Sequence, residues 1–452
     1  MKIFNPEDTI CAITTGGGMS AIAVIRISGK HAISISNSIF SKNINNFKSH
    51  TIHFGNITDQ KRIVDEVLLS IFKDNNSFTG EESVEISCHG SIYIQKTIIQ
   101  LLIKKGCRMA SPGEFTMRAF KNGKLDLSQA ESISDLISSE SSREHQTALQ
   151  NLKGGFSSDL QELRKQLINF ASLVELELDF SEEDVEFANR EEFENLLKLI
   201  KSKIENLIES FKLGNVIKQG ISVAILGSPN VGKSTLLNCL LNEEKAIVSN
   251  IAGTTRDSIE DEMNIDGYKF RFIDTAGIRE TSDTIENLGI NKTLDKAENS
   301  NITLYVLDAN TDISNQLKEL DKLEDKIKKK TLIVVNKIDL KSITQKKLDN
   351  AIYISAKDNK GIETLKKKLL TYIDTKKLSN NETIITNLRH YDELQLTLHE
   401  INTIIEGLKN GVTGDFLAIN IREALVHLGS ITGEITSDTL LGNIFGKFCI
   451  GK

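Results

Sequence analysis

The stretch ISVAILGSPNVGKSTLLNCLL, residues 221–241, joins an apolar run to a glycine-rich loop and then to an amphipathic run. The loop has the pattern G-x-x-x-x-G-K-S, which is specific when it lies between a strand and a helix. Gly227 and Gly232 let the backbone turn closely around an anion, so that amide N–H groups face it. Lys233 adds positive charge for β- and γ-phosphates, and the Ser234 hydroxyl suits Mg²⁺. The stretch predicts a P-loop domain that binds a nucleoside triphosphate.

Further elements along the chain select GTP among the nucleotides. Thr255, within GTTRD, offers a second hydroxyl to the metal, and Asp274 begins DTAG after the apolar run KFRFI, where a carboxylate holds Mg²⁺ through water. In Asn336-Lys337-Ile338-Asp339, after TLIVV, the Asp339 carboxylate can accept both N–H groups of guanine, a pair that adenine does not offer. Ser355-Ala356-Lys357 follows AIYIS and completes the predicted base pocket.

Ile278 stands where Ras-like GTPases carry a glutamine that positions the attacking water. Isoleucine neither accepts a proton nor orients water, so hydrolysis must be slow or must use another group. Arg256 and Arg279 are candidate arginine fingers, with ordinary surface ion pairs as the alternative. The acidic candidates, among which the residues alone do not choose, are Glu280, Asp283 and Glu286.

Composition indicates a multidomain globular protein. The 452 residues exceed what a single core of about 250–300 residues accommodates, and 39% hydrophobic with 26% charged residues is typical of globular chains. The net charge of −7 excludes a surface that is basic overall, so nucleic acid would have to meet a local patch. The 5 cysteines are dispersed without a C-x-x-C pair, and the chain lacks a signal peptide or a long apolar span. We therefore expect a cytoplasmic protein with reduced thiols and no membrane contact.

The apolar periodicity predicts a multidomain α/β architecture. Residues 1–118 mix short β-branched runs with one helical stretch, as in a compact α+β domain, and residues 119–215 have the apolar spacing of an all-α domain. In residues 216–374 apolar runs alternate with helical stretches, as in a Ras-like P-loop GTPase domain with a largely parallel sheet. Helical periodicity returns in residues 375–452, so we expect the GTPase domain to be inserted into one helical domain.

Motifs outside the phosphate loop extend over the whole chain. They are SFTGEESVEISCHG, ASPGEFTMRAFKNGKLDLSQAES, IAGTTRD, DTAGIRETSDTIENLGI and ITGEITSDTLLGNIFGKFCIGK. With these motifs the chain resembles the MnmE (TrmE) family of tRNA-modification GTPases. The resemblance implies an N-terminal domain that dimerises and binds 5,10-methylenetetrahydrofolate (or 5-formyltetrahydrofolate as a bound analogue), a helical domain and an inserted GTPase domain. It also implies a homodimer that forms a heterotetramer with FAD-containing MnmG and places an aminomethyl or carboxymethylaminomethyl group on C5 of the wobble uridine, position 34, of certain tRNAs.

For the missing glutamine, the resemblance implies that K⁺ drives dimerisation of the GTPase domains and offsets charge that develops between the β- and γ-phosphates. The matching K⁺ ligands are the Asn230 side chain, the backbone of Ser249 and Ile251, and Thr254. Glu286 matches the carboxylate that orients water, although by the residues alone it is a solvated helix residue. The predicted Mg²⁺ ligands are Ser234 and Thr255. The predicted GTP-binding residues are Asn230, Val231, Gly232, Lys233, Ser234, Thr235, Ser249, Asn250, Ile251, Ala252, Gly253, Thr254, Thr255, Asp274, Thr275, Ala276, Gly277, Asn336, Lys337, Asp339, Ser355, Ala356 and Lys357.

The folate positions carried over by the resemblance are Arg26, Glu85, Lys124 and Lys452. A carboxylate such as Glu85 suits the paired N–H edge of a pterin, and basic groups suit a glutamate tail. For each of them alone an ordinary surface charge is the alternative. Cys449 matches the C-terminal cysteine of the family and is expected near the one-carbon unit, with an inert buried thiol as the alternative.

Two functions fit the GTPase elements alone. One is an enzyme that couples GTP hydrolysis and dimer rearrangement to tRNA wobble-uridine modification, and the other is a regulatory switch that acts in ribosome assembly. The FCIGK ending and the folate residues favour the first, because an assembly factor has no evident reason to carry them.

Overall fold

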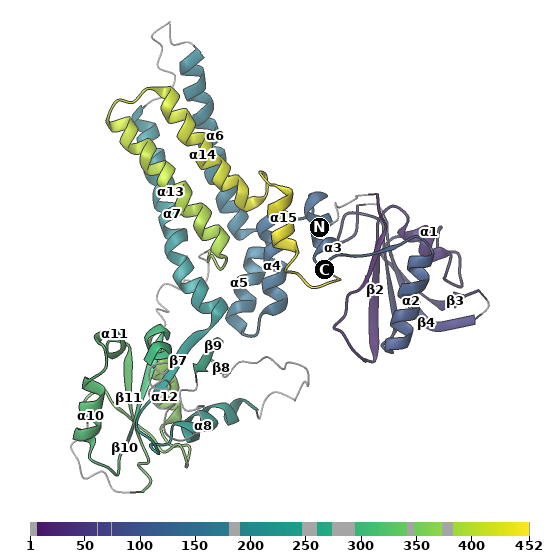
Figure 1. Cartoon of the computed structure of the whole chain (residues 1–452). Helices are drawn as coiled ribbons and strands as arrows, with labels where there is room; N and C mark the ends of the chain where they lie inside the picture. The colour runs from purple at the N-terminus through teal and green to yellow at the C-terminus, as the bar shows by residue number, and fades with distance from the viewer. Residues whose placement is uncertain are drawn as a thin grey trace, which may run out of the picture. The chain divides into compact units, whose positions relative to one another are not determined.

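The computed structural model describes residues 7–60, 62–73, 75–179, 190–245, 260–273, 294–340, 348–372 and 383–451. The chain forms two compact units, each with its own sheet (Figure 1). The first unit contains residues 1–137, 148–204 and 392–452, and the second contains residues 138–147 and 205–391. The domain boundaries predicted at residues 118, 215 and 374 are finer than this division and stay predictions.

The first unit contains a six-stranded sheet in the order β3-β4-β5-β2-β1-β6. Neighbouring strands are antiparallel except for the parallel pair β1 and β6. The strands are β1 (Ile10–Ile13), β2 (Ile22–Ser28), β3 (Thr51–Asp59), β4 (Arg62–Phe72), β5 (Ser83–His89) and β6 (Arg108–Met109). Alternation along β2 places Ala23, Ile25 and Ile27 in a core with residues of α1 (Ala32–Asn37) and α2 (Ile92–Lys104). Arg26, on the other face, is half-buried.

The same unit contains helices of 8 to 30 residues. They are α3 (Glu114–Lys121), α4 (Leu127–Ser138), α5 (Ser142–Leu152), α6 (Gly155–Asp179), α7 (Arg190–Gln219), α13 (Leu388–Lys409), α14 (Gly414–Thr432) and α15 (Asp438–Phe445). The last residue of α4, the first residues of α5, the end of α7 and the start of α13 belong to the second unit. His427 on α14 bonds Glu393 on α13 at 2.8 Å, and Phe170 on α6 stacks on Phe193 of α7. These contacts join α6, α7, α13 and α14 in a bundle (Figure 1). No helix in the described part of the chain has the length and apolarity needed to span a membrane.

The second unit contains a six-stranded sheet in the order β12-β11-β10-β7-β9-β8. All pairs are parallel except the edge hairpin β8–β9. The strands are β7 (Ile221–Leu226), β8 (Glu260–Ile265), β9 (Tyr268–Ile273), β10 (Ile302–Asp308), β11 (Thr331–Asn336) and β12 (Ile352–Tyr353). The helices that follow them are α8 (Lys233–Lys245), α10 (Ile313–Asp321), α11 (Asp325–Lys328) and α12 (Ile362–Leu370).

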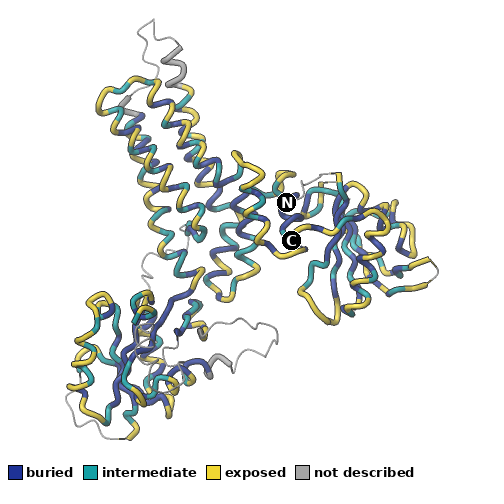
Figure 2. Tube along the Cα trace, in the orientation of Figure 1, coloured by how far each residue is buried: buried dark blue, intermediate teal, exposed yellow. Residues whose placement is uncertain are grey.

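Every residue of β7 and β10 is buried, as Figure 2 shows by the dark colour of these strands. Successive β7 residues enter different cores: Val223 and Ile225 pack into one, and Ala224 and Leu226 into the other. A sheet covered on both faces needs such continuous apolar runs. The second sheet is thus the predicted parallel sheet of a P-loop domain, and its strands end where loops carry polar residues.

Candidate functional site

The phosphate loop follows β7 and leads into α8, as the sequence predicts. Gly227 has φ +143° and Gly232 has φ +96°, which L-residues with a Cβ rarely adopt. A Cβ would lie 2.3 Å from the carbonyl oxygen of Val306 at Gly227, and 2.4 Å from Asn336 Nδ2 at Gly232. Both positions therefore require glycine because neighbouring atoms approach the backbone. The Lys233 ammonium donates to the Gly227 and Ser228 carbonyls at 2.8 and 2.9 Å, so it lies over the loop.

Asn336 ends β11, and Lys337 begins the loop after it, which contains Asp339 and is called the base loop. Both residues bond the phosphate loop. Asn336 Nδ2 donates to the Val231 carbonyl at 3.0 Å, and Lys337 Nζ donates to the Asn230 carbonyl at 2.6 Å. Asn336 Oδ1 also accepts from the backbone N–H of Ala356 at 3.0 Å. Asn336 is 2% exposed, so its amide has these backbone groups as partners in place of water. Two successive side chains thus hold two successive carbonyls of the phosphate loop.

The Asp339 carboxylate is oriented by the loop after β12. Ser355 Oγ donates to Asp339 Oδ1 at 2.7 Å and accepts from the backbone N–H of Asp358 at 3.1 Å. The hydrogen bond from Ser355 is the main cause that holds the pKa of Asp339 below its usual range. The carboxylate is therefore ionised near neutral pH, as an acceptor of two N–H groups from a guanine edge must be.

The structure brings together the predicted GTP-binding residues of the phosphate, NKID and SAK loops. Ser234 and Thr235 are exposed in the first turn of α8, so the Ser234 hydroxyl fits the chemistry of a Mg²⁺ ligand. The remaining predicted residues lie outside the described part of the chain: Ser249, Asn250, Ile251, Ala252, Gly253, Thr254, Thr255, Asp274, Thr275, Ala276, Gly277 and Glu286. Ile278 and the candidate groups Arg256, Arg279, Glu280 and Asp283 lie there too.

Asp308 is a residue of this site that the sequence reasoning missed. It ends β10 and is paired in register with Asn336 at the end of β11. Its carboxylate lies 2.7 Å from Lys337 Nζ. The sequence signal was limited to a polar residue that closes the apolar run ITLYVL; its place beside Asn336 follows from the strand register and not from the sequence.

Two of the predicted folate residues, Arg26 and Glu85, face each other across β2 and β5. Their side chains join through Arg26 Nε and Glu85 Oε1 at 2.8 Å and are 21% and 27% exposed. The Arg26 guanidinium also lies 5.1 Å from the Phe78 ring centre and 5.6 Å from that of Phe115. A partly exposed carboxylate, a cation and two aromatic rings suit a flat heterocycle with N–H donors. Lys124 is exposed and donates to the Asn75 carbonyl at 2.8 Å.

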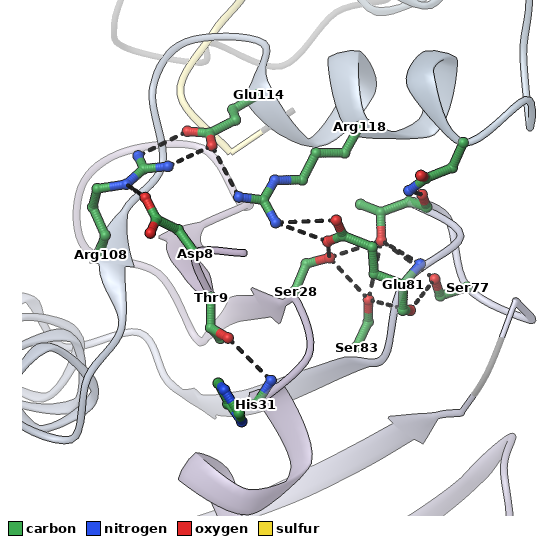
Figure 3. Close-up of polar contacts among 12 residues, drawn as sticks. Asp8, Thr9, Ser28, His31, Ser77, Glu81, Ser83, Arg108, Glu114 and Arg118 are labelled. Carbon is green, nitrogen blue, oxygen red and sulfur yellow. Dashed lines mark hydrogen bonds and ion pairs between the residues drawn. The ribbon is translucent and has the colours of Figure 1, made fainter. Parts of the chain in front are cut away.

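A buried ion-pair network holds the segments that carry Phe78 and Phe115 (Figure 3). Arg118 on α3 lies between two carboxylates: its Nη1 donates to Glu81 at 3.0 and 3.1 Å, and its Nη2 to Glu114 at 3.2 Å. Glu114 also accepts from Arg108 Nη2 at 2.7 Å, and Ser28 Oγ donates to Glu81 at 2.8 Å. The network joins α3, with Phe115, to the loop with Phe78, and the sequence reasoning did not identify it.

The C-terminal segment lies against the N-terminal sheet. The Cys449 carbonyl accepts from the backbone N–H of Gly113 at 3.4 Å, and a Cβ on Gly451 would lie 2.3 Å from the Ile13 carbonyl oxygen. Ile13 follows Ala12, the β1 residue paired with Arg26. Cys449 is exposed, so the alternative of a buried thiol is wrong for it. Lys452 lies outside the described residues.

Comparisons with known proteins find two family models and full-length relatives. The family described as the GTP-binding protein TrmE N-terminus matches residues 9–124, and that described as the MnmE helical domain matches residues 127–449. A protein of Flavobacterium psychrophilum named tRNA modification GTPase MnmE is 55% identical over 99% of each chain, and one of Flavobacterium johnsoniae with the same name is 54% identical over 99% of each. Among solved structures, the FeoB G-domain from Methanococcus jannaschii is 26% identical over 34% of this chain and 97% of that chain, with a TM-score of 0.24.

The matches cover nearly all of the chain, and their order agrees with a multidomain α/β protein that has an N-terminal α+β domain, a helical domain and a P-loop GTPase domain. The glycine-lined phosphate loop and the oriented Asp339 carboxylate both lie in the second unit, which carries the largely parallel sheet. The chain therefore belongs to the MnmE family of tRNA modification GTPases.

Proposed function

We propose that this chain is a K⁺-activated GTPase that acts with an MnmG-type flavoprotein on certain tRNAs. Together they would form the aminomethyl or carboxymethylaminomethyl group at C5 of the wobble uridine, position 34. Family membership supports GTP hydrolysis in tRNA modification. The observation that carries the GTP site is the convergence of Asn336 and Lys337 on the carbonyls of Val231 and Asn230.

Within the proposed nucleotide site, each residue has a role that follows from its chemistry. The phosphate loop and Lys233 bind the phosphates, Ser234 with Thr255 holds Mg²⁺, and Asp339 reads guanine. The Asn230 residue is exposed, and the bond from Lys337 is to its backbone carbonyl and not to its side chain. We assign that side chain to K⁺, together with the backbone of Ser249 and Ile251 and with Thr254. The bound cation supplies positive charge beside the β- and γ-phosphates.

Glu286 is the proposed group that orients the attacking water, because Ile278 cannot do so. The test compares GTP turnover in K⁺ and in Na⁺ at equal ionic strength, for the native chain and for Glu286→Ala. We expect markedly faster turnover in K⁺, and we expect Glu286→Ala to bind GTP but lose most turnover. Equal rates in both salts would remove the K⁺ mechanism, and unchanged turnover of the variant would move the water-orienting role to another acid.

The proposed folate site consists of Arg26, Glu85, Lys124 and Lys452, with Cys449 near the one-carbon unit. Its support is the partly exposed Arg26–Glu85 pair beside two aromatic rings. Calorimetry with 5-formyltetrahydrofolate tests it: Glu85→Gln should weaken binding, whereas Glu66→Gln, at an exposed position of the neighbouring strand β4, should not. Equal affinities of the two variants would exclude Glu85 as the acceptor of the pterin.

The open face of the N-terminal sheet supports the proposed homodimer. Three large apolar side chains alternate outward along β3 and β4: Ile52, Phe54 and Leu68 are 66%, 58% and 47% exposed. Phe54 and Leu68 are directly paired across the two strands, so they form continuous apolar surface that a second copy would cover. Sedimentation of a Phe54→Glu variant tests this, and an unchanged dimer would place the interface elsewhere.

Nucleoside analysis of tRNA from cells that lack the protein is the decisive test of the whole function. We expect the C5 substituent of the wobble uridine to disappear and to return with the native gene. Intact modification in those cells would remove the proposed function, and a simultaneous defect in ribosomal subunits would then favour a switch in ribosome assembly.

A further inference from the structure

Two residues of the proposed nucleotide site have a left-handed backbone although neither is glycine. Asn230 has φ +65° and Lys337 has φ +64°. A left-handed conformation is unfavourable for residues with a Cβ, and it persists where the surroundings hold it. The two residues lie on different loops and meet through the hydrogen bond from Lys337 Nζ to the Asn230 carbonyl, at 2.6 Å. What holds Lys337 therefore also acts on the phosphate loop.

Asp308 holds the ammonium group of Lys337, and Asn310 holds its backbone carbonyl. Asp308 Oδ2 accepts from the Lys337 ammonium at 2.7 Å, and Asn310 Nδ2 donates to the Lys337 carbonyl at 3.2 Å. Asp308 and Asn310 are also joined to each other. Asp308 Oδ1 accepts from the backbone N–H of Asn310 at 2.9 Å and from Asn310 Nδ2 at 3.0 Å. Side chain and backbone of Lys337 are thus fixed by one connected set of bonds.

Asp308 is itself well fixed. Gln316 on α10 accepts from the Asp308 backbone N–H at 2.9 Å and donates to its carbonyl at 3.1 Å. The side chain is 12% exposed, against 30% for Lys337. Burial opposes ionisation of Asp308, yet the bonds from Lys337 and Asn310 outweigh it and keep its pKa below the usual range. A rigid, ionised carboxylate is what an ammonium group needs in order to keep one position.

We propose that Asp308 is a positioning residue for guanine-nucleotide binding, which holds Lys337 against the Asn230 carbonyl and so keeps the base loop and the phosphate loop together. The inference rests on the proposed nucleotide site and names a residue outside the motifs that predicted it. Without the carboxylate, the ammonium loses its charged acceptor, and the long lysine side chain regains rotamers that reach solvent. The two loops then separate more easily, and the nucleotide leaves faster.

The expected effect is the same for GDP and for GTP, because Asp308 acts on the connection between the loops and not on the γ-phosphate. Discrimination against adenine nucleotides should not change, because the Asp339 carboxylate and its Ser355 partner are untouched. We expect Asp308→Asn to speed nucleotide release about tenfold, as the loss of one partly exposed charge-assisted hydrogen bond does.

The experiment measures release of a fluorescent GDP analogue from the full chain by stopped flow, with excess GDP as the chase. Asp321→Asn is the matched control, because it removes the same charge from an exposed position at the end of α10. The deciding comparison uses Lys337→Met. If Asp308 acts through Lys337, release from Asp308→Asn/Lys337→Met is no faster than from Lys337→Met alone. If Asp308 acts by a route other than the Lys337 ammonium, the two effects multiply, and the inference is wrong.

The outcomes separate this inference from the proposed function. Failure of the native chain to bind the GDP analogue would refute the nucleotide site and the inference with it. Normal binding, with native release rates for Asp308→Asn, would refute the inference alone. Should Asp308→Asn melt below the assay temperature, Asn310→Ala takes its place, since it removes the amide between Asp308 and the Lys337 carbonyl. About threefold faster release is then expected, and a native rate would overturn the inference.

Discussion

Replacement of Arg118 by methionine would remove the central cation of the buried network in Figure 3. The Arg118 side chain is fully buried, while its partners Glu81 and Glu114 are 16% and 2% exposed. Methionine keeps most of the apolar stem and removes the guanidinium. Glu114 would retain its bonds from Arg108, but Glu81 would lose both bonds from Arg118 and keep the one from the Ser28 hydroxyl. The variant therefore leaves a poorly compensated negative charge behind the N-terminal sheet.

The structure sets the size of the expected effect. Removal of one partner from a buried ion pair costs about 3–5 kcal/mol in the free energy of unfolding. The lower end applies here, because both carboxylates keep a donor and Glu81 is partly exposed. About 3 kcal/mol corresponds to roughly 100-fold in an opening equilibrium. Lys30→Met is the matched control: its pair with Glu7 is 3.7 Å long with both side chains at least 70% exposed, so we expect less than about fivefold.

Hydrogen exchange measured by mass spectrometry is the appropriate assay. A chain of several domains does not melt in one two-state transition, whereas peptides from β2 and β5 report on the N-terminal sheet alone. Their slowest amides should exchange about 100-fold faster in Arg118→Met than in the native chain. Exchange as slow as in Lys30→Met would refute the reasoning, since it would mean that the cost of desolvating Arg118 already cancels what its ion pairs contribute.

Three other outcomes follow from the described geometry. Gly232→Ala should weaken GTP binding at least about tenfold in an equilibrium titration, because the new Cβ would lie 2.4 Å from Asn336 Nδ2; native affinity would contradict this. Burial, and then Asp65, raises the pKa of Cys88 to about 11, so peptide mapping after brief alkylation at pH 8 should show the exposed Cys449 labelled well before Cys88. Burial opposes ionisation of Glu114, but the hydrogen bond from Arg108 and its other donors outweigh burial and lower the pKa of Glu114. The stability that ionised Glu114 contributes is therefore complete above about pH 4.3, the pKa of an unfolded glutamate. That stability is lost as the pH falls below this value. Denaturation from pH 7 to 3 should accordingly show a flatter acid limb in Glu114→Gln than in the native chain.

The phosphate loop was predictable because its geometry is local. A strand, a turn with two glycines and a helix follow one another directly, and the turn itself needs the positive φ of Gly227 and Gly232. The position of Asp339 just after a strand was predictable for the same reason, as its motif closes the apolar run of β11. Asp308 was not, because its role depends on the register of β10 against β11, which places it beside Asn336. No pattern within either strand specifies that pairing.

In the N-terminal domain, even fewer of the side-chain contacts could be predicted from the sequence. The α+β class follows from short β-branched runs, but the partners of Arg118 are set by tertiary packing: Glu114 is 4 positions away in the chain and Glu81 is 37. Sequence reasoning treats such residues as surface charges, since charged side chains are almost never fully buried unless paired. Only the fold reveals that they face one another inside it.

In both candidate sites, charged side chains outside the predicted ligand-binding set fix the position of residues that belong to this set or flank it. Asp308 fixes Lys337, and the Arg118 network fixes the two segments whose rings, Phe78 and Phe115, flank the Arg26 guanidinium. Neither Asp308 nor Arg118 is among the predicted ligand-binding residues, so their loss should change how long a ligand stays bound and how rigid its site is, while the predicted ligand-binding residues remain in place. A scan limited to the motif residues would overlook them, and release rates measured on Asp308 and Arg118 variants would detect them.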